Sequence, residues 1–197
     1  MPEPHVKRVG PHKVGGDGDL EIFCADEQSD IEIDVPRWHR LAENVIRSEG
    51  VRGATELTLM FVPESAIAGL NEKYMGKSGS TDVLAFPLDA VESVRSPGPG
   101  SMSRGPERMP IDLNDLPLLL GDVVICPAVA KRQSPTHAGN LEDELALLVV
   151  HGILHVLGFD HDKDEQAKKM QTRELELLEQ YHWGFTMPET FRNVYQS

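Results

Sequence analysis

The fold is decided by the stretch His151-Gly152-Ile153-Leu154-His155-Val156-Leu157-Gly158-Phe159-Asp160-His161. If the residues before it are helical, His151 and His155 project from one helix face, where two imidazoles can bind one ion. Gly158 stands where a glycine of positive φ ends a helix and turns the chain. That turn brings His161 towards the same ion. The spacing therefore predicts a helix that carries two metal ligands and a following loop that carries the third.

The residue type at these three positions favours zinc. Three neutral imidazoles suit one Zn²⁺ ion and leave its fourth tetrahedral position to water, as in catalytic zinc sites. The pKa of such a water falls from about 16 to near 7, so metal-bound water is the expected catalytic group. The alternative is three unrelated core histidines. However, three of the eight histidines fall within this one short stretch, with a glycine between the second and the third.

A metallopeptidase is a less favoured interpretation of the same spacing. Zinc proteases with this ligand pattern place a glutamate directly after the first histidine, where it acts as the general base. This chain has Gly152 at that position. The peptidase hypothesis therefore lacks its base.

Length and composition are typical of one compact domain. The chain has 197 residues, of which 40% are hydrophobic, which is enough for a sizeable core. The sequence has no run of about 20 apolar residues that would span a membrane and no apolar leader, so we expect a cytoplasmic protein. Cys24 and Cys126 are far apart and are interpreted as reduced core thiols.

The net charge argues against general nucleic-acid binding. The formal charge is −13 at pH 7, and an acidic surface repels phosphate. A local basic patch can nevertheless coexist with a negative total, because net charge describes solubility and non-specific binding more than it describes a cleft.

Hydrophobic periodicity predicts alternating strands and helices. Strands are expected over 20–24, 56–62, 83–87 and 118–126, the last of them apolar enough for the interior of a sheet. Helices are expected over 37–49, 65–75, 127–132, 141–157 and 162–181, with Gly50 closing the first. Residues 1–18 are expected to form a mobile tail, 19–185 a single domain with a mobile insertion at about 89–117, and 186–197 a C-terminal tail.

The helix over 141–157 is expected to be central, because it is apolar nearly all round. Asn140 is a suitable N-cap for it. Glu144 shares a face with His151, but we favour a first-turn glutamate stabilised by the helix dipole over one that orients a ligand. Asp160 and Asp162 flank the third ligand, and either could accept the second N–H of a ligand imidazole. Asp160 is preferred in that role.

The eleven-residue stretch resembles the signature H-G-x-L-H-x-x-G-x-D-H of the YbeY family of bacterial endoribonucleases and rRNA maturation factors, and matches every fixed position. Residues 71–87 are similar to the family's N-x-x-Y-R and P-T-D-V-L-S-F-P elements, and residues 120–125 to its L-G-D-I-x-I strand. The resemblance covers roughly residues 20–182. It implies an α+β, zincin-like fold, with a small mixed β-sheet covered by helices and a central helix carrying the metal-binding histidines.

One departure from the family pattern concerns charge. Met75 stands where the family has an arginine that is expected to bind phosphate or to act in catalysis, and methionine cannot stabilise negative charge on phosphorus. Lys73 and Lys77 lie on either side and are candidates for phosphate stabilisation, as is Arg132. For each of these three cations, a side chain that simply faces solvent is the alternative.

The resemblance implies a zinc-dependent, single-strand-specific endoribonuclease in rRNA processing. Its expected role is 3′-end maturation of small-subunit rRNA and ribosome quality control. The implied partners are precursor rRNA and the small ribosomal subunit, with ribosomal proteins and an assembly GTPase as further family partners. A non-catalytic ribosome assembly factor with a structural metal is the alternative, which Met75 and the acidic charge favour somewhat.

Overall fold

The computed structural model describes residues 7–9, 20–51, 53–88, 117–160, 163–184 and 186–191. The strands are β1 Lys7–Val9, β2 Leu20–Asp26, β3 Thr55–Phe61, β4 Val83–Pro87 and β5 Leu118–Ile125. The α-helices are α1 Val35–Ser48, α2 Glu64–Leu70, α4 Pro127–Gln133, α5 Leu141–Val156 and α6 Asp164–Leu178. Shorter helical segments are η1 Asn71–Met75, η3 Ser134–Thr136 and η4 Glu179–Trp183.

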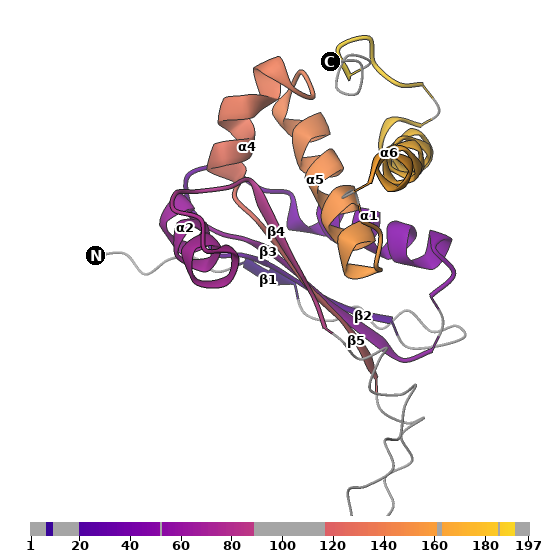
Figure 1. Ribbon diagram of the computed structural model, residues 1–197, viewed down its shortest axis with the longest axis horizontal. Helices are drawn as coiled ribbons and strands as arrows, with labels where there is room; N and C mark the ends of the chain where they lie inside the picture. The colour runs from indigo at the N-terminus through magenta and orange to yellow at the C-terminus, as the bar shows by residue number, and fades with distance from the viewer. Residues whose placement is uncertain are drawn as a thin grey trace, which may run out of the picture.

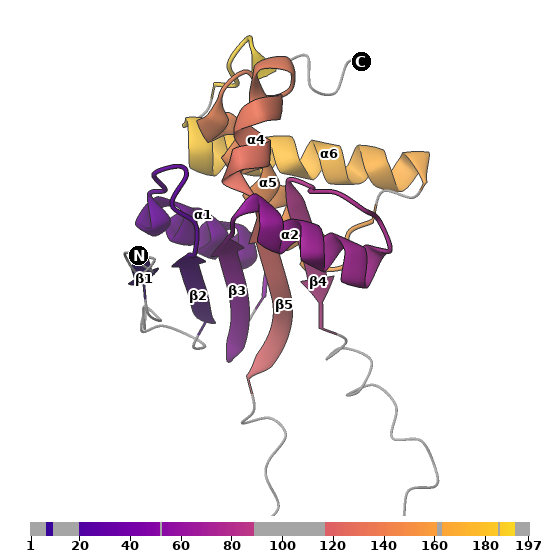
Figure 2. The ribbon, with the colours of Figure 1, turned by 90° about the vertical axis from the view of Figure 1, so that its left-hand side faces the viewer.

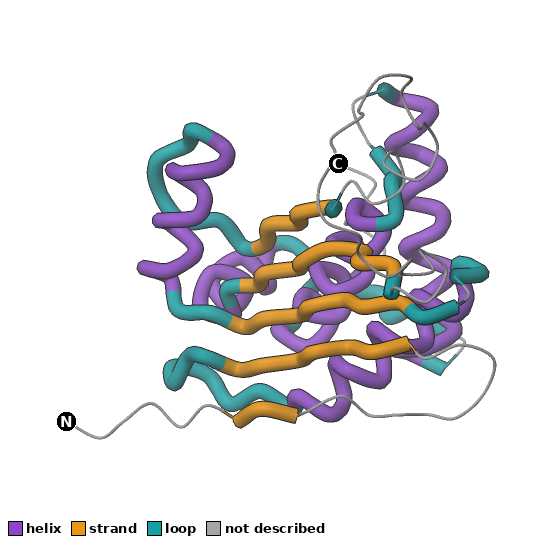
Figure 3. The backbone as a smooth tube through the Cα atoms, turned by 90° about the horizontal axis from the view of Figure 1, so that it is seen from below, coloured by secondary structure: helices purple, strands orange, loops and turns teal. Residues whose placement is uncertain are grey.

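One mixed sheet organises the chain, with the strand order β1-β2-β3-β5-β4. The central strands β2, β3 and β5 are parallel, and β1 and β4 pair antiparallel at the two edges. The helices α1, α4, α5 and α6 lie on one side of the sheet (Figure 1). In the view from below, the strands stand in front of these helices and α2 lies at one end (Figure 3). The prediction of a mixed sheet covered by helices is therefore confirmed.

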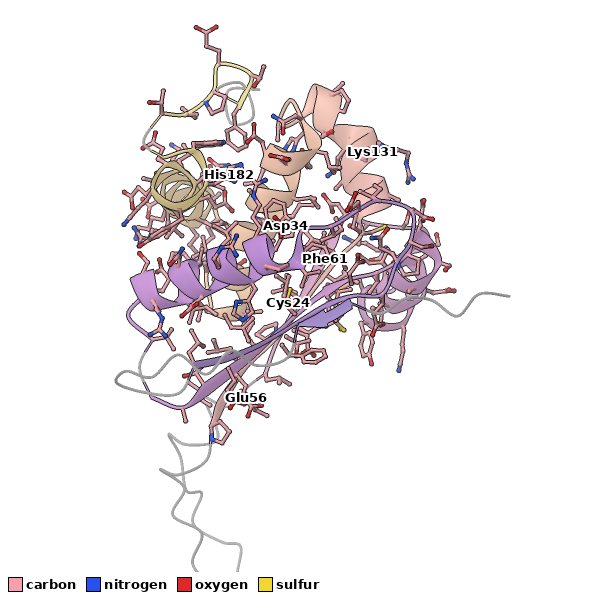
Figure 4. All side chains as sticks on the ribbon, turned by 180° about the vertical axis from the view of Figure 1, so that it is seen from behind. Cys24, Asp34, Glu56, Phe61, Lys131 and His182 are labelled. Carbon is pink, nitrogen blue, oxygen red and sulfur yellow. The ribbon has the colours of Figure 1, made fainter. Side chains whose placement is uncertain are left out.

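The main core lies between the sheet and the large helices. It contains Cys24, Phe61 and the buried residues of α1 and α5, and Figure 4 labels the first two. A second, smaller cluster lies under α2 on the other face of the sheet and includes Ile67 and Val124. Cys24 and Cys126 are both free and buried, as predicted. Burial and the charge of Asp26 raise the pKa of the Cys24 thiol to about 12.

Helix α5 occupies the centre of the helical layer, where it contacts α1, α4, α6, β4 and β5. Asn140 caps its first turn as predicted, with its side-chain oxygen accepting from the backbone N–H of Asp143 at 2.9 Å. At the other end, the N–H of Gly158 donates to the carbonyl of His155 and that of Phe159 to the carbonyl of Leu154. Gly158 has a φ of 92°, which is the left-handed C-cap expected from the sequence.

The C-terminal part of the chain is joined to α5. His182 Nε2 and Trp183 Nε1 of η4 each donate to Asp143 Oδ1 at 2.7 Å, and Figure 4 labels His182 beside the helices. Phe191 is fully buried, although the sequence places it in a tail. Residues 7–9 likewise fall inside the expected N-terminal tail, but they form strand β1, which pairs with β2.

The remaining residues of both tails and residues 89–116 of the expected insertion lie outside the described residues. Figure 2 shows how the two strands that flank this insertion, β4 and β5, lie side by side. Within the part of the chain that the structure describes, no helix is both long enough and apolar enough to cross a bilayer.

Candidate functional site

Helix α5 presents the two predicted ligands as a pair. His151 and His155 are both half-buried, and their ring centroids lie 4.5 Å apart at an interplanar angle of 81°. The two Nε2 atoms face each other at 3.1 Å. The i, i+4 spacing places both rings on one helix face, as the sequence predicts.

The other nitrogen of each ring is held by an acceptor. His151 Nδ1 lies 2.7 Å from Glu174 Oε1 of α6, and His155 Nδ1 lies 3.0 Å from the backbone carbonyl of Phe159. A carbonyl can only accept, so His155 Nδ1 carries a hydrogen and its Nε2 bears a lone pair in the neutral ring. The carboxylate of Glu174, which is 2% exposed, favours the same tautomer for His151.

These rings fit a metal ion. Two lone pairs at 3.1 Å repel unless a proton or a metal cation lies between them. Bonds from zinc to nitrogen of about 2.0 Å at the tetrahedral angle would place the two nitrogens about 3.3 Å apart. The acceptors on Nδ1 are the outer partners that metal-bound histidines generally have. His151 and His155 could therefore hold a metal ion together.

The third predicted ligand, His161, lies outside the described residues, as does Asp162. Within the described ranges, no group of three or more His, Cys, Asp or Glu side chains is placed to hold a metal. The three-histidine site thus stays a prediction. Asp160 is exposed at the end of its described segment, and the Nδ1 partners of the first two histidines are Glu174 and the Phe159 carbonyl.

Two pockets meet at His151. The larger, of 690 Å³, runs from the two histidines along β4 to η1 and the loop after it; its lining includes Met75, Lys77, Ser80 and Ala85. The smaller, of 330 Å³, is lined by Asp82, His137, His151 and Glu174, among others. We call the larger pocket the β4 groove. Strand β4 is an edge strand, so its outer side borders this groove directly.

The predicted cations are placed unequally. Lys77 lines the β4 groove, whereas the ammonium of Lys73 lies 4.8 Å from the ring centre of Tyr74. Arg132 makes two bonds to the carboxylate of Glu64, at 2.7 and 2.6 Å. These bonds, with one from Ser80 Oγ, lower the pKa of Glu64 from 4.5 to about 2. Arg132 is therefore paired with a carboxylate and is not directed at the groove.

Gly152, which follows the first histidine, lies where α5 contacts the sheet. A Cβ atom at this position would lie 2.5 Å from Val123 Cγ1 of β5, closer than nonbonded carbon atoms approach one another. Helix α5 can therefore lie this close to β5 only because residue 152 has no side chain. The glutamate that a zinc protease needs after its first histidine has no room here.

Sequence reasoning did not find two of the polar partners. Glu174 is 23 residues from His151 in sequence, and no local pattern links them. Glu144 is fully buried and holds His137, with Nδ1 of that ring 2.9 and 3.0 Å from its two oxygens. Glu144 and His137 are seven residues apart, on either side of the turn before α5. A histidine just upstream of a first-turn glutamate was therefore the sequence signal that could have indicated this pair.

The fold and the paired rings define a class of mixed α/β proteins in which a buried helix presents two oriented imidazoles beside an antiparallel edge strand. This chain belongs to the YbeY family, because the family profile described as Endoribonuclease YbeY matches residues 23–182. The family resemblance expected from the sequence is confirmed. The curated relatives are named as endoribonucleases, which supports the broad class of nuclease.

Curated relatives named Endoribonuclease YbeY support the assignment. The protein from Acidothermus cellulolyticus is 40% identical over 160 residues, which cover 81% of this chain and 90% of that one. The protein from Thermobifida fusca is 37% identical over 81% of this chain and 92% of its own length. The solution structure of TM1509 from Thermotoga maritima is similar in fold, with a TM-score of 0.50 and 24% identity over 84% of this chain and 89% of that chain.

Proposed function

We propose that this protein is an endoribonuclease that uses one zinc ion to cleave single-stranded precursor rRNA. The observation that carries the proposal is the pair of Nε2 atoms of His151 and His155, facing each other at 3.1 Å beside the β4 groove. Family membership supplies the substrate class, since the relatives are named as endoribonucleases. The third ligand in the proposal is His161.

Glu174, the Phe159 carbonyl and Lys77 each have a task in this function. Glu174 and the Phe159 carbonyl orient the two rings and fix their tautomers, so both Nε2 lone pairs are available to a cation. A bound zinc ion would supply Lewis acidity towards a phosphate and a lowered pKa for water. Lys77 places a positive charge on the groove wall, where it would attract the backbone of a nucleic acid.

An exposed aromatic ring next to the groove supports a single-stranded substrate. Tyr74 is 55% exposed and directly precedes Met75, which lines the groove. Phe86 of β4 holds the Tyr74 ring edge-on, with ring centres 5.2 Å apart. Unpaired bases stack on exposed aromatic rings, whereas bases in a duplex are already stacked on each other.

The cellular setting follows the family. We propose that the protein works in the cytoplasm on the small ribosomal subunit, in 3′-end maturation of its rRNA and in ribosome quality control. Ribosomal proteins and an assembly GTPase are the further partners that the family suggests.

A non-catalytic assembly factor with a structural metal is the second candidate. Met75 lines the groove at the position of the family arginine and brings no charge to it. The two candidates differ in turnover, because an assembly factor would bind precursor rRNA and the metal but would cut nothing.

The test measures metal content and RNA cleavage on the same preparations. Purified protein is analysed for zinc and incubated with an end-labelled precursor-rRNA oligonucleotide, with and without chelator. We expect about one zinc per chain and chelator-sensitive cleavage, both of which His151→Ala and His155→Ala abolish. Glu174→Gln should weaken zinc binding by about 10- to 100-fold.

Glu176→Gln is the matched control for this series, because Glu176 lies on the same helix as Glu174 but pairs with Arg173 at the surface. It should keep both zinc and activity. Cleavage that persists in zinc-free His151→Ala would refute the endoribonuclease mechanism. Zinc binding without cleavage by the unchanged protein would favour the assembly factor, and cleavage of a peptide substrate would favour the metallopeptidase.

A further inference from the structure

A second histidine–carboxylate pair lies beside the paired imidazoles. Glu144 is fully buried, and its two oxygens accept from His137 Nδ1 at 2.9 and 3.0 Å. Gln133 Nε2 also donates to it at 2.8 Å and the backbone N–H of Ala138 at 3.1 Å. Three donors thus satisfy this one buried carboxylate. The hydrogen of the His137 ring is therefore held on Nδ1.

The ring itself reaches the site. The side chain of His137 is 42% exposed and lines the 330 Å³ pocket together with His151. Its Nδ1 is occupied by Glu144, and Nε2 makes no hydrogen bond to any residue that the structure describes. A ring held on one side by a buried carboxylate, with the other nitrogen at a pocket, is the arrangement of histidines that transfer protons in enzymes.

The pair is fixed relative to the β4 groove. Gln133 Nε2 donates to Asp82 Oδ2 at 2.6 Å as well as to Glu144. Asp82 in turn accepts from the backbone N–H of Val83, the first residue of β4, at 2.8 Å. One amide thus connects the carboxylate behind His137 to the beginning of the groove wall. The position of the ring is set by side chains from α4, α5 and the segment before β4.

We propose that His137 is the proton donor to the ribose oxygen that leaves when the RNA backbone is cleaved, and that Glu144 is its positioning residue. The inference rests on the proposed endoribonuclease function. The oxygen of water bonds to phosphorus as the bond from phosphorus to the leaving oxygen breaks, and that oxygen takes the proton of His137 Nε2. The proton lost by the water passes to solvent, and the neutral ring regains a proton from solvent.

The charges around His137 suit this role. Glu144 faces it from α5, Asp82 lies behind Gln133, and His151 and Glu174 also line the shared pocket. These groups place carboxylates beside the ring that donates the proton in the proposal. A purely structural pair would serve only to satisfy Glu144 and to close the turn before α5. The two roles differ in their dependence on the chemistry of the leaving group.

The decisive experiment changes the leaving atom. The termini of the products of the unchanged protein identify which ribose oxygen leaves, and an oligonucleotide is made with sulfur at that single bridging position. A thiolate, whose conjugate acid has a pKa of about 8.5 in cysteine, leaves without a proton far more readily than an alkoxide. We expect His137→Ala to cleave the ordinary oligonucleotide about 10²- to 10⁴-fold more slowly and the sulfur oligonucleotide at a rate comparable to that of the unchanged protein.

Two further readouts separate catalysis from structure. A proton donor must carry its proton to act, so the proposal expects the rate of the unchanged protein to fall at high pH and this limb to be absent in His137→Ala. Thr136→Ala, at the exposed neighbouring position, is the matched control and should leave both rates and the pH profile as they are. Thermal unfolding of His137→Ala establishes that the variant is folded under the assay conditions.

The outcomes are distinct. An unchanged rate of His137→Ala on the ordinary oligonucleotide, or an equal loss on both oligonucleotides, overturns the assignment of His137 as proton donor. Such a result leaves the endoribonuclease function standing, because the unchanged protein still cleaves. If the unchanged protein does not cleave the ordinary oligonucleotide, the proposed function fails, and this inference fails with it.

Discussion

Replacing Gly152 by alanine tests how closely α5 packs against the sheet. The new Cβ would lie 2.5 Å from Val123 Cγ1, and Val123 is fully buried. Overpacking of this kind costs about 1–3 kcal/mol, whereas alanine in a helix interior is about 1 kcal/mol better than glycine. We expect Gly152→Ala to lower the free energy of unfolding by about 1 kcal/mol, measured by urea denaturation followed by circular dichroism.

Val123→Ala provides the control for this prediction. Alone it removes two buried methyl groups and should cost about 1.6 kcal/mol from lost apolar burial, plus a further amount for the cavity. Combined with Gly152→Ala, it makes room for the new methyl group. The double variant should therefore be more stable than the sum of the two single losses by about 1–3 kcal/mol. Strict additivity would show that the two positions do not touch and would refute the packing argument.

Two other predictions concern titratable groups. The pKa of Glu64 is lowered to about 2 by Arg132 and its other donor, so its ion pair stabilises the fold above pH 4.5 and this contribution is lost as the pH falls towards 2. The difference in unfolding free energy between Glu64→Gln and the unchanged protein should therefore shrink from pH 6 to pH 3; a constant difference would contradict the assignment. Cys24 has its pKa raised to about 12 and is buried along with Cys126. A thiol reagent at pH 8 should therefore label neither cysteine until denaturant is added, and rapid labelling of the native protein would disprove this burial.

Much of the fold was predictable because its signals are local. The nearly continuous apolar composition of α5, the N-cap Asn140 and the C-terminal Gly158 are all local signals, and each was found where expected. The interior position of β5 also followed from composition, since a strand buried on both faces is apolar throughout. Strand β1 was missed because three residues carry too little periodicity to predict a strand.

The polar partners at the site were less predictable, because they depend on tertiary packing. Glu144 shares a helix face with His151, but two turns of helix separate them by about 10 Å. The nearer imidazole is His137, which the turn before α5 brings to the carboxylate. Glu174 reaches His151 only because α6 packs against α5. Sequence alone could thus identify the rings but not what holds them.

Because His151 lines two pockets, its position affects how a polymer could enter and leave the site. Neither pocket is an enclosed cavity, and the imidazole forms part of the wall of both. A long polymer can therefore be laid sideways across the ring, with no need to thread a free end. Once the polymer is severed there, neither half has to leave through a closed tunnel. Such a layout suits cutting in the middle of a chain and removes any demand for processive movement from one terminus.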